Sequence, residues 1–210
     1  MKIDLHMHST VSDGTDAPLE LLGKVREAGI DVFAVTDHDD IAACGEIVSA
    51  ISESDSEEKK YPKFIPGAEF AAKDELGRYH IVGLGYDPEA GPIRALVDDC
   101  RSKRVQRVRL RLEYLEEVFG MTLPEEEKEA LFKLKNPGRP HIGNLLVKYG
   151  YAPDRNTAIR EYVNKTKTPG VGRIGPQQAI EAILASGGVP VLAHAILGDG
   201  NQMGDRKSVV

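Results

Sequence analysis

The chain has 210 residues, 41% apolar and 29% charged, which is typical of a globular protein with one sizeable core and room for a small insert. The net charge of −6 argues against a general nucleic-acid coat protein, and no apolar run is long enough for a membrane span or a secretory leader. Two cysteines, Cys44 and Cys100, are too few for a disulfide framework or a thiolate zinc cluster, so we expect both in the core of a cytoplasmic protein.

The first predicted strand leads directly into two histidines. Ile3 and Leu5 alternate within residues 1–5 and predict a short buried strand, which His6 and His8 follow. Side chains two residues apart on a strand point to the same face, so this pair would project together. Imidazole is the commonest protein ligand for metals, although two neighbouring structural histidines would explain this pair alone equally well.

The next elements repeat the arrangement, with acids and histidines where strands end. Asp16 as N-cap and Pro18 predict the start of a helix that stops at Gly29. The next expected features are a strand over 30–35, a polar segment over 36–40 that contains His38, a helix over 41–51 and a charged loop over 53–60. A strand from Phe64 towards Glu69, a turn over 74–77 and a strand over 79–86 that contains His80 follow. This alternation predicts an α/β fold with its site at the strand ends.

The middle of the chain shows only helical patterns. One apolar stripe runs through Val105, Val108, Leu112, Leu115 and Phe119, and further helices are expected from Thr122, over 141–149 and over 156–163. The α/β pattern then resumes with a helix through Ala179–Leu184, a stop at Gly187-Gly188, and a strand over 189–193 with His194 at its end. Residues 198–210 are polar, glycine-rich and without periodicity, which indicates a disordered tail or a truncated or frame-altered longer chain.

Seven side chains share a position at or beside the end of a predicted strand: His6, His8, Asp13, His38, Glu69, His80 and His194. Imidazoles mixed with carboxylates suit zinc, manganese or iron. Seven ligands are too many for one tetrahedral ion, so we expect a multinuclear centre in which Glu69 could bridge two ions. Closely spaced metals activate a hydroxide near neutral pH and hold the oxygens of a phosphoryl group. We therefore expect no catalytic protein side chain, and no serine or cysteine nucleophile beside a base is evident.

These motifs resemble the PHP (polymerase and histidinol phosphatase) family of metal-dependent phosphoesterases, in particular its small bacterial members with a helical insert. The matching segments are His6-Met-His8-Ser-Thr-Val-Ser-Asp13-Gly, Val35-Thr-Asp-His38-Asp, Pro66-Gly-Ala-Glu69, His80 and Val191-Leu-Ala-His194. The resemblance implies a distorted (β/α)7 barrel with up to three manganese, iron or zinc ions. By position, His6 and His8 would hold one ion, which Glu69 would bridge to a second held by His80 and His194, and Asp13 with His38 would hold a third.

The same resemblance divides the chain and exposes one departure. We expect barrel segments over 1–91 and 166–197, an all-helical insertion over 92–165 and an irregular tail over 198–210. The family usually supplies a final Asp and His from a Gly-Ser-Asp-x-His segment, and nothing in Gly198–Val210 matches it. The resemblance therefore implies an incomplete site and two missing strands. The absent Asp and His could reflect truncation of the chain, a frame change or a genuine loss of activity.

The helical region carries a second group of candidate residues. Gly138-Arg139-Pro140-His141 and Val171-Gly172-Arg173 resemble basic positions of these small enzymes, so Arg139, His141 and Arg173 are expected to bind a substrate phosphate. Guanidinium forks and a helix start both suit phosphate oxygens, whereas a plain structural role would leave Arg139 only capping a helix. Six basic residues over 101–111 could follow a nucleic-acid backbone, but the apolar stripe in that helix favours an exposed charged face.

The resulting expectation is a hydrolase in which a metal-bound hydroxide attacks a phosphate monoester. The resemblance implies a small nucleotide substrate, with a nucleoside 3′,5′-bisphosphate as first choice. Hydrolysis of short RNA from its 5′ end, hydrolysis of histidinol phosphate, and an inactive metal-binding scaffold are the alternatives. No membrane partner is expected, and the sequence does not indicate an oligomeric state.

Overall fold

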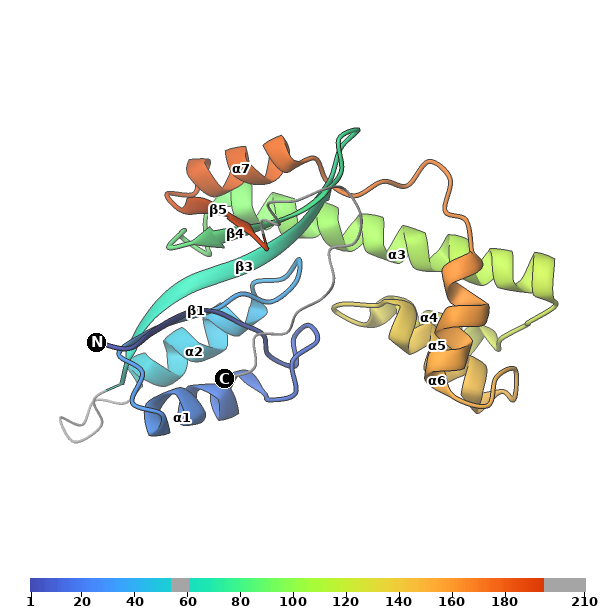
Figure 1. Cartoon of the computed structure of the whole chain (residues 1–210), viewed down its shortest axis with the longest axis horizontal. Helices are drawn as coiled ribbons and strands as arrows, with labels where there is room; N and C mark the ends of the chain where they lie inside the picture. The colour runs from blue at the N-terminus through green and yellow to red at the C-terminus, as the bar shows by residue number, and fades with distance from the viewer. Residues whose placement is uncertain (54–60, 195–210) are drawn as a thin grey trace.

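One curled sheet of five strands forms the centre of the molecule in the computed structural model, which describes residues 1–53 and 61–194 (Figure 1). The strands pair in chain order: β1 (Ile3–Met7), β2 (Val32–Val35), β3 (Lys63–Lys73), β4 (Arg78–Leu84) and β5 (Val189–Ala193). The first three strands run parallel, and β4 is antiparallel to both of its neighbours, β3 and β5. The sheet is half of a barrel, so the α/β fold class is confirmed as a barrel that is incomplete within the described residues.

Helices cover one face of the sheet and extend beyond it. They are α1 (Pro18–Glu27), α2 (Ala42–Ser52), α3 (Gly91–Phe119), α4 (Glu125–Lys133), α5 (Arg139–Lys148), α6 (Arg155–Glu161), the short 3-10 helix η1 (Val163–Lys165) and α7 (Pro176–Ala185). In Figure 1, α1 and α2 lie at one end of the sheet, α7 lies at the other, and α3 runs from the sheet out to α4, α5 and α6. None of the described helices combines the length and the apolar character that crossing a bilayer requires.

Three groups of buried side chains hold these layers together. The first joins α1 and α2 to β2 around Phe33 and Ile47, and the second joins α7 and the first part of α3 to β3 and β4 around Phe70 and Ile93. The third lies wholly among the helices beyond the sheet. Helix α3 contributes to two of these cores, because its residues up to Cys100 pack on the sheet and those from Val108 onward pack on the other helices. Cys44 and Cys100 are both buried free thiols, as predicted.

Local boundaries differ from the prediction at the first helix. The N-cap of α1 is Ala17 rather than Asp16. The Glu20 carboxylate accepts from the Ala17 N–H at 2.9 Å, while Asp16 accepts from the Lys24 ammonium at 2.6 Å. A carboxylate from within the first turn thus does the capping that the sequence assigned to Asp16.

Other sequence predictions fall on parts of the chain that the structure does not describe. The expected loop over 53–60 is described only at Glu53, and the tail over 198–210 lies outside the described residues altogether. The division into barrel segments and a helical insertion stays a prediction. Helix α3 begins at the predicted boundary near residue 91 and packs both on the sheet and on the other helices.

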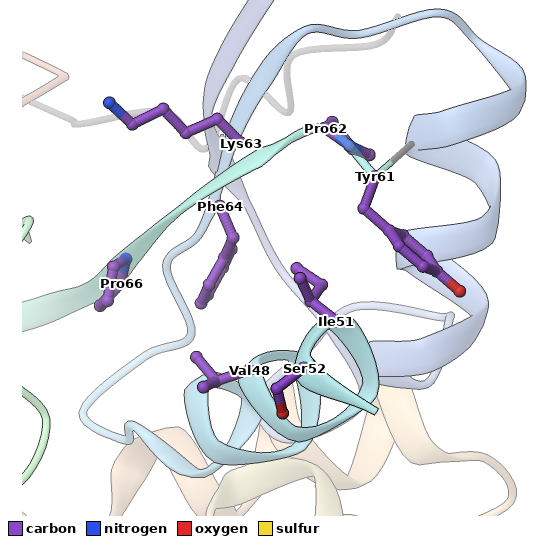
Figure 2. A pocket seen from close by; sticks show the side chains of 8 residues that line it. All are labelled: Val48, Ile51, Ser52, Tyr61, Pro62, Lys63, Phe64 and Pro66. Carbon is purple, nitrogen blue, oxygen red and sulfur yellow. The ribbon is translucent and has the colours of Figure 1, made fainter. Parts of the chain in front are cut away.

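A hollow of about 430 Å³ lies between α2 and the start of β3 (Figure 2). Phe64 points from β3 towards Val48 and Ile51 of α2, whereas Lys63 points away on the other side of the strand. The hollow lies at the amino end of β3, whereas Glu69 lies further along that strand and His8 and His38 follow the carboxyl ends of β1 and β2. It is therefore remote from the predicted site.

Candidate metal centre

Glu69 lies in the middle of the sheet face that the helices leave free. Side chains alternate along β3, and since Ala68 and Phe70 join the core beneath α7, Glu69 points to the opposite face. Its side chain is 0% exposed. The same alternation on β4 sends Ile81 into the core and His80 to the free face, one diagonal step from Glu69 in the strand register.

The other histidines reach Glu69 from the remaining strands. Met7 packs against the core of α1 and α2, so its neighbour His6 faces the free side of β1, and His8 follows the strand. His38 lies three residues beyond β2 and forms an isolated bridge with Glu69, and His194 directly follows β5. The structure therefore brings His38 and His194 to the amino-terminal pair, as the predicted site requires.

Five imidazole nitrogens surround the Glu69 carboxylate at short distances. Its Oε2 lies 3.3 Å from His6 Nε2, 3.3 Å from His8 Nε2 and 3.2 Å from His38 Nδ1, and its Oε1 lies 2.9 Å from His80 Nδ1 and 3.3 Å from His194 Nε2. The rings form a closed circle with centroids 4.6 to 5.8 Å apart, in the order His6, His8, His38, His80, His194 and back to His6.

This arrangement leaves buried polar atoms without hydrogen bonds. Both carboxylate oxygens of Glu69, His6 Nε2 and His80 Nδ1 are buried and have no hydrogen-bond partner among the described residues. An unpaired buried carboxylate is costly, and native structures rarely keep one without an ion or a water. Two ligand atoms that each lie roughly 2.1 Å from one zinc ion are themselves about 3 to 4 Å apart, as these nitrogen and oxygen atoms are. The residues therefore fit divalent metal ions.

The electrostatics of the group point the same way. Burial alone would raise the pKa of Glu69, but the surrounding imidazoles hold the pKa far below its ordinary value, so the carboxylate stays charged. Burial lowers the pKa of His38 despite the charge of Glu69. Burial would also lower the pKa of His8, but Glu69, with Asp13 and Asp37, raises it. The site thus keeps a charged carboxylate beside His38, whose lowered pKa favours the neutral ring, and these are the forms that bind metals.

Asp13 completes the group from the loop after β1. Its carboxylate is largely exposed, with Oδ1 3.6 Å from His8 Nδ1 and Oδ2 3.9 Å from His38 Nε2. By distance, two sets of possible ligands share Glu69, namely His6 with His194 and His8 with His38. This pairing differs from the one that the family resemblance implies. All seven predicted ligands lie together around Glu69. Which of them would share an ion stays a prediction.

A buried network fixes the loop that carries Asp13. Asp37 is 1% exposed and accepts from the Ser9 N–H at 2.8 Å, the Ser9 hydroxyl at 2.6 Å and the Ser12 hydroxyl at 2.6 Å. Gly14 closes the loop so tightly that a Cβ there would lie 2.1 Å from the His8 carbonyl oxygen. Asp37 thus joins the loop after β1 to the end of β2, instead of capping α2, where Asp40 accepts from the Ala42 N–H at 2.8 Å.

Two contacts connect the site to the helices beyond the sheet. Asp39, which follows His38, has a left-handed backbone with φ of 56° and accepts from the Ala71 N–H at 2.9 Å. Its second oxygen binds the guanidinium of Arg104 from α3. Asn136, before α5, donates to the His38 carbonyl at 3.2 Å. Sequence reasoning did not predict either contact, because Arg104 and Asn136 lie 65 and 98 residues from their partners.

The predicted phosphate-binding residues lie beside this connection. His141 accepts from the Gly138 N–H at 3.2 Å through Nδ1, at the start of α5, and its pKa is lowered by burial and then by Arg104. Arg139 donates to the side-chain oxygen of Asn164 at 2.9 Å. The pKa of Arg173 is lowered by burial and by neighbouring arginines that include Arg139. The structure thus brings the three together near Arg104, and phosphate binding by them stays a prediction.

The profile of the PHP domain family matches residues 4–165. The 5′-3′ exoribonuclease Rnm of Salmonella typhimurium is 35% identical over 199 residues, which cover 91% of this chain and 64% of that protein. The 3′,5′-nucleoside bisphosphate phosphatase of Chromobacterium violaceum is 29% identical over 202 residues, which cover 91% of this chain and 66% of that protein. The chain therefore spans about two thirds of the length of these curated relatives.

A solved structure shows the same fold. The crystal structure of a protein from Bifidobacterium adolescentis, provisionally described as a metal-dependent phosphoesterase, superposes with a TM-score of 0.72 at 29% sequence identity. The similarity covers 93% of this chain and 67% of that one. The half-barrel and its helical extension therefore match an arrangement that has been observed experimentally.

Proposed function

The chain belongs to the PHP domain family, and from that premise we propose that it is a metal-dependent phosphoesterase that acts on a nucleotide. The observation that carries the proposal is the buried Glu69 carboxylate, whose oxygens have no hydrogen-bond partner among the described residues and face five imidazole nitrogens within 3.3 Å. The relatives named above as a phosphatase and an exoribonuclease both act on phosphate esters, which supports this reaction class.

The proposed ligands of up to three ions are His6, His8, Asp13, His38, Glu69, His80 and His194. Manganese, iron and zinc all suit this mixture of nitrogen and oxygen donors. Such ions, when bound, would activate water as a nucleophile and neutralise charge that develops on the phosphate. The protein's contribution is a fixed arrangement of imidazoles around one carboxylate, and the hydrogen bonds of Asp37 and Asp39 hold the loops after β1 and β2 in place.

We assign the grip on a substrate phosphate to Arg139, His141 and Arg173. Arg139 is the first residue of α5, where the positive end of the helix dipole favours an anion. His141 uses Nδ1 for the helix start, so Nε2 is the nitrogen left to face a ligand. A phosphate held there and a second phosphate at the metal centre suit a nucleoside 3′,5′-bisphosphate.

Phosphate release from a nucleoside 3′,5′-bisphosphate in the presence of Mn²⁺ tests the proposal. We expect turnover that EDTA abolishes, and we expect Arg139→Ala to raise KM or abolish turnover while the metal content is unchanged. Loss of metal in that variant would contradict the assignment of Arg139 to the substrate. Metal binding without release of phosphate from any ester would instead indicate an inactive scaffold.

Shortening of RNA from its 5′ end is the second candidate function, favoured by the exoribonuclease name of a 35% identical relative. Assays on a short 5′-phosphorylated RNA, run in parallel with the bisphosphate, separate the two. Histidinol phosphate serves as a third substrate in the same series, and we expect the slowest turnover with it because it offers one phosphate rather than two.

A further inference from the structure

Four arginines from three parts of the fold lie close enough to repel one another: Arg107 and Arg111 on α3, Arg139 at the start of α5, and Arg173 before α7. Burial first, and then the charge of neighbouring arginines, lowers the pKa of Arg107, Arg111 and Arg173. A guanidinium stays protonated in proteins, so these are positive charges held together against their repulsion.

The partners of these arginines are neutral or missing. Arg107 donates to the Gly172 carbonyl at 2.8 Å, and Arg139 donates to the amide of Asn164. The Nε of Arg111 is buried and has no hydrogen-bond partner among the described residues. Asp39 is the acid that moderates the charge of Arg107 and Arg173, but Arg104 already binds it. Several guanidinium groups are thus left without a carboxylate in the described part of the chain.

The α3 arginines form a row that begins at the candidate metal centre. Arg104, Arg107 and Arg111 are spaced three and four residues apart, so they lie on one face of the helix. Arg104 is tied to Asp39 beside His38, and Arg111 lies about 10 Å further along the axis, at 1.5 Å per residue. The row therefore leads from the metal centre along α3 towards α5 and α6, as the course of α3 in Figure 1 shows.

Arg139, His141 and Arg173 already supply the donors for one phosphate in the proposed function, so Arg107 and Arg111 are in excess for a mononucleotide. A guanidinium pairs with phosphate oxygens through two parallel hydrogen bonds, and a basic groove that continues from an active site is typical of proteins that hold single strands. Neighbouring phosphates of a nucleotide strand are joined through one sugar, so the phosphate that follows the one at the first grip would reach this row.

We propose that Arg107 and Arg111 form a second phosphate subsite, which binds the next phosphodiester of a single-stranded oligonucleotide. The inference rests on the proposed function for the position of the terminal phosphate at the metal centre. It narrows the substrate class, because a 5′-phosphorylated strand of three or more nucleotides carries a phosphate for the metal centre and one for each subsite, while the two phosphates of a nucleoside bisphosphate would leave the row empty.

This subsite is tested by measuring binding rather than turnover. A failure of the subsite can then be distinguished from a failure of the proposed activity. The Kd of a fluorescent 5′-phosphorylated trinucleotide and of a labelled nucleoside 3′,5′-bisphosphate are measured by anisotropy with the full chain in EDTA. We expect Arg107→Ala and Arg111→Ala each to raise the Kd of the trinucleotide by about fivefold or more. The Kd of the bisphosphate should change by less than about twofold. The slope of log Kd against log salt should fall by about 0.7 for the trinucleotide.

Two further variants control this experiment. Arg26→Ala removes one exposed arginine from α1, beside Tyr61, and should leave both Kd values unchanged. Arg111→Lys keeps the charge without the fork, so it should restore the salt slope but only part of the affinity. Circular dichroism confirms that each variant is folded.

The outcomes are decisive in both directions. Equal losses for the two ligands would overturn the subsite, because the row would then belong to the first grip, and so would unchanged binding of the trinucleotide. An acidic hexapeptide that displaces the trinucleotide at equal concentration would overturn the assignment to a nucleic-acid strand. A protein that releases no phosphate, yet loses trinucleotide affinity selectively in both variants, would keep the subsite and overturn the proposed activity.

Discussion

The histidine circle and the α3 arginine row adjoin each other but solve opposite electrostatic problems. The circle surrounds one buried carboxylate with five imidazoles, whereas the row gathers like charges of which, among the described residues, only Arg104 is paired with a carboxylate. Among the described residues, the buried atoms of the circle without a hydrogen bond include both oxygens of Glu69, and those of the row include the Nε of Arg111. The first therefore calls for cations and the second for an anion.

The supports of the two regions differ as well. Most of the circle is attached to strands whose register fixes the side chains, as with Glu69 and His80 on β3 and β4. The row stands on a helix that leaves the sheet, and one ion pair between Arg104 and Asp39 joins the two. The proposed ion site is thus held by the register of strands, whereas the proposed phosphate subsite stands on one face of a helix.

The largest effect is expected from Glu69→Gln. The substitution keeps the shape of the side chain but removes the charge that the two sets of possible ligands share, so it should release metal and lower phosphate release by about 10³-fold or more. Metal analysis of the dialysed protein together with the phosphate assay measures it. Arg173→Ala provides the contrast, since it should reduce activity while the metal content stays at the level of the unchanged protein.

Arg104→Ala breaks the connection between the two regions. It leaves the Asp39 carboxylate, which is 5% exposed, without its partner, and loss of one partner of a fully buried pair costs about 3–5 kcal/mol. Because Arg104 itself is 21% exposed, we expect a loss of about 2 kcal/mol in the free energy of unfolding, measured with urea. Metal affinity should fall too, since Asp39 holds the backbone next to His38. Arg104→Lys should recover most of the stability, and no change in either quantity would show that the pair is not a connection.

Much of the circle could be predicted from the sequence because strand periodicity is short and local. His6 lies in β1 and His8 directly follows it, and Glu69 and His80 each alternate with residues of the core, so their common face follows from a period of two. The same reasoning identified the α/β class from strands that alternate with helices. The profile match to the PHP domain family then agreed with the resemblance that these motifs carry.

The row could not be predicted because a helix does not reveal which neighbour each face meets. The apolar stripe from Val105 to Phe119 indicated an exposed charged face, and it describes only the part of α3 that packs on other helices. The face that carries Arg104, Arg107 and Arg111 is instead partly buried. Arg104 contacts Asp39 and Arg107 contacts Gly172, and each partner lies 65 residues away in the sequence. Contacts across such separations leave no local signal in a single sequence.

The metal-free protein should lose stability in acid because of the circle. The pKa of Glu69 is far below its ordinary value of 4.5, so the unfolded chain binds a proton below pH 4.5 that the folded protein does not. This stability is present above pH 4.5 and decreases by about 1.4 kcal/mol per pH unit below it.

Near pH 6.5 the contributions of the histidines oppose each other. The lowered pKa of His38 costs stability as the pH falls, and the raised pKa of His8 costs stability as the pH rises. Urea unfolding in EDTA from pH 3.5 to 8 should therefore show its main slope below pH 4.5, and Glu69→Gln should flatten it. An equal slope in that variant would assign the acid sensitivity to other carboxylates.

The smallest effect concerns the opposite side of α3. The guanidinium of Arg109 lies 4.0 Å from the centroid of the Phe132 ring, a cation–π contact worth about 0.5–1 kcal/mol at an exposed position. Arg109→Leu should therefore lower the free energy of unfolding by about that amount, while KM, kcat and trinucleotide affinity stay within about twofold. Arg111→Leu, two residues along the same helix, should give the reverse pattern, because it removes an unpaired charge and with it the affinity for the strand. If both variants changed trinucleotide binding equally, the charge of α3 as a whole, rather than one face of it, would attract the ligand, and the contrast between a directed row and an ordinary charged helix would fail.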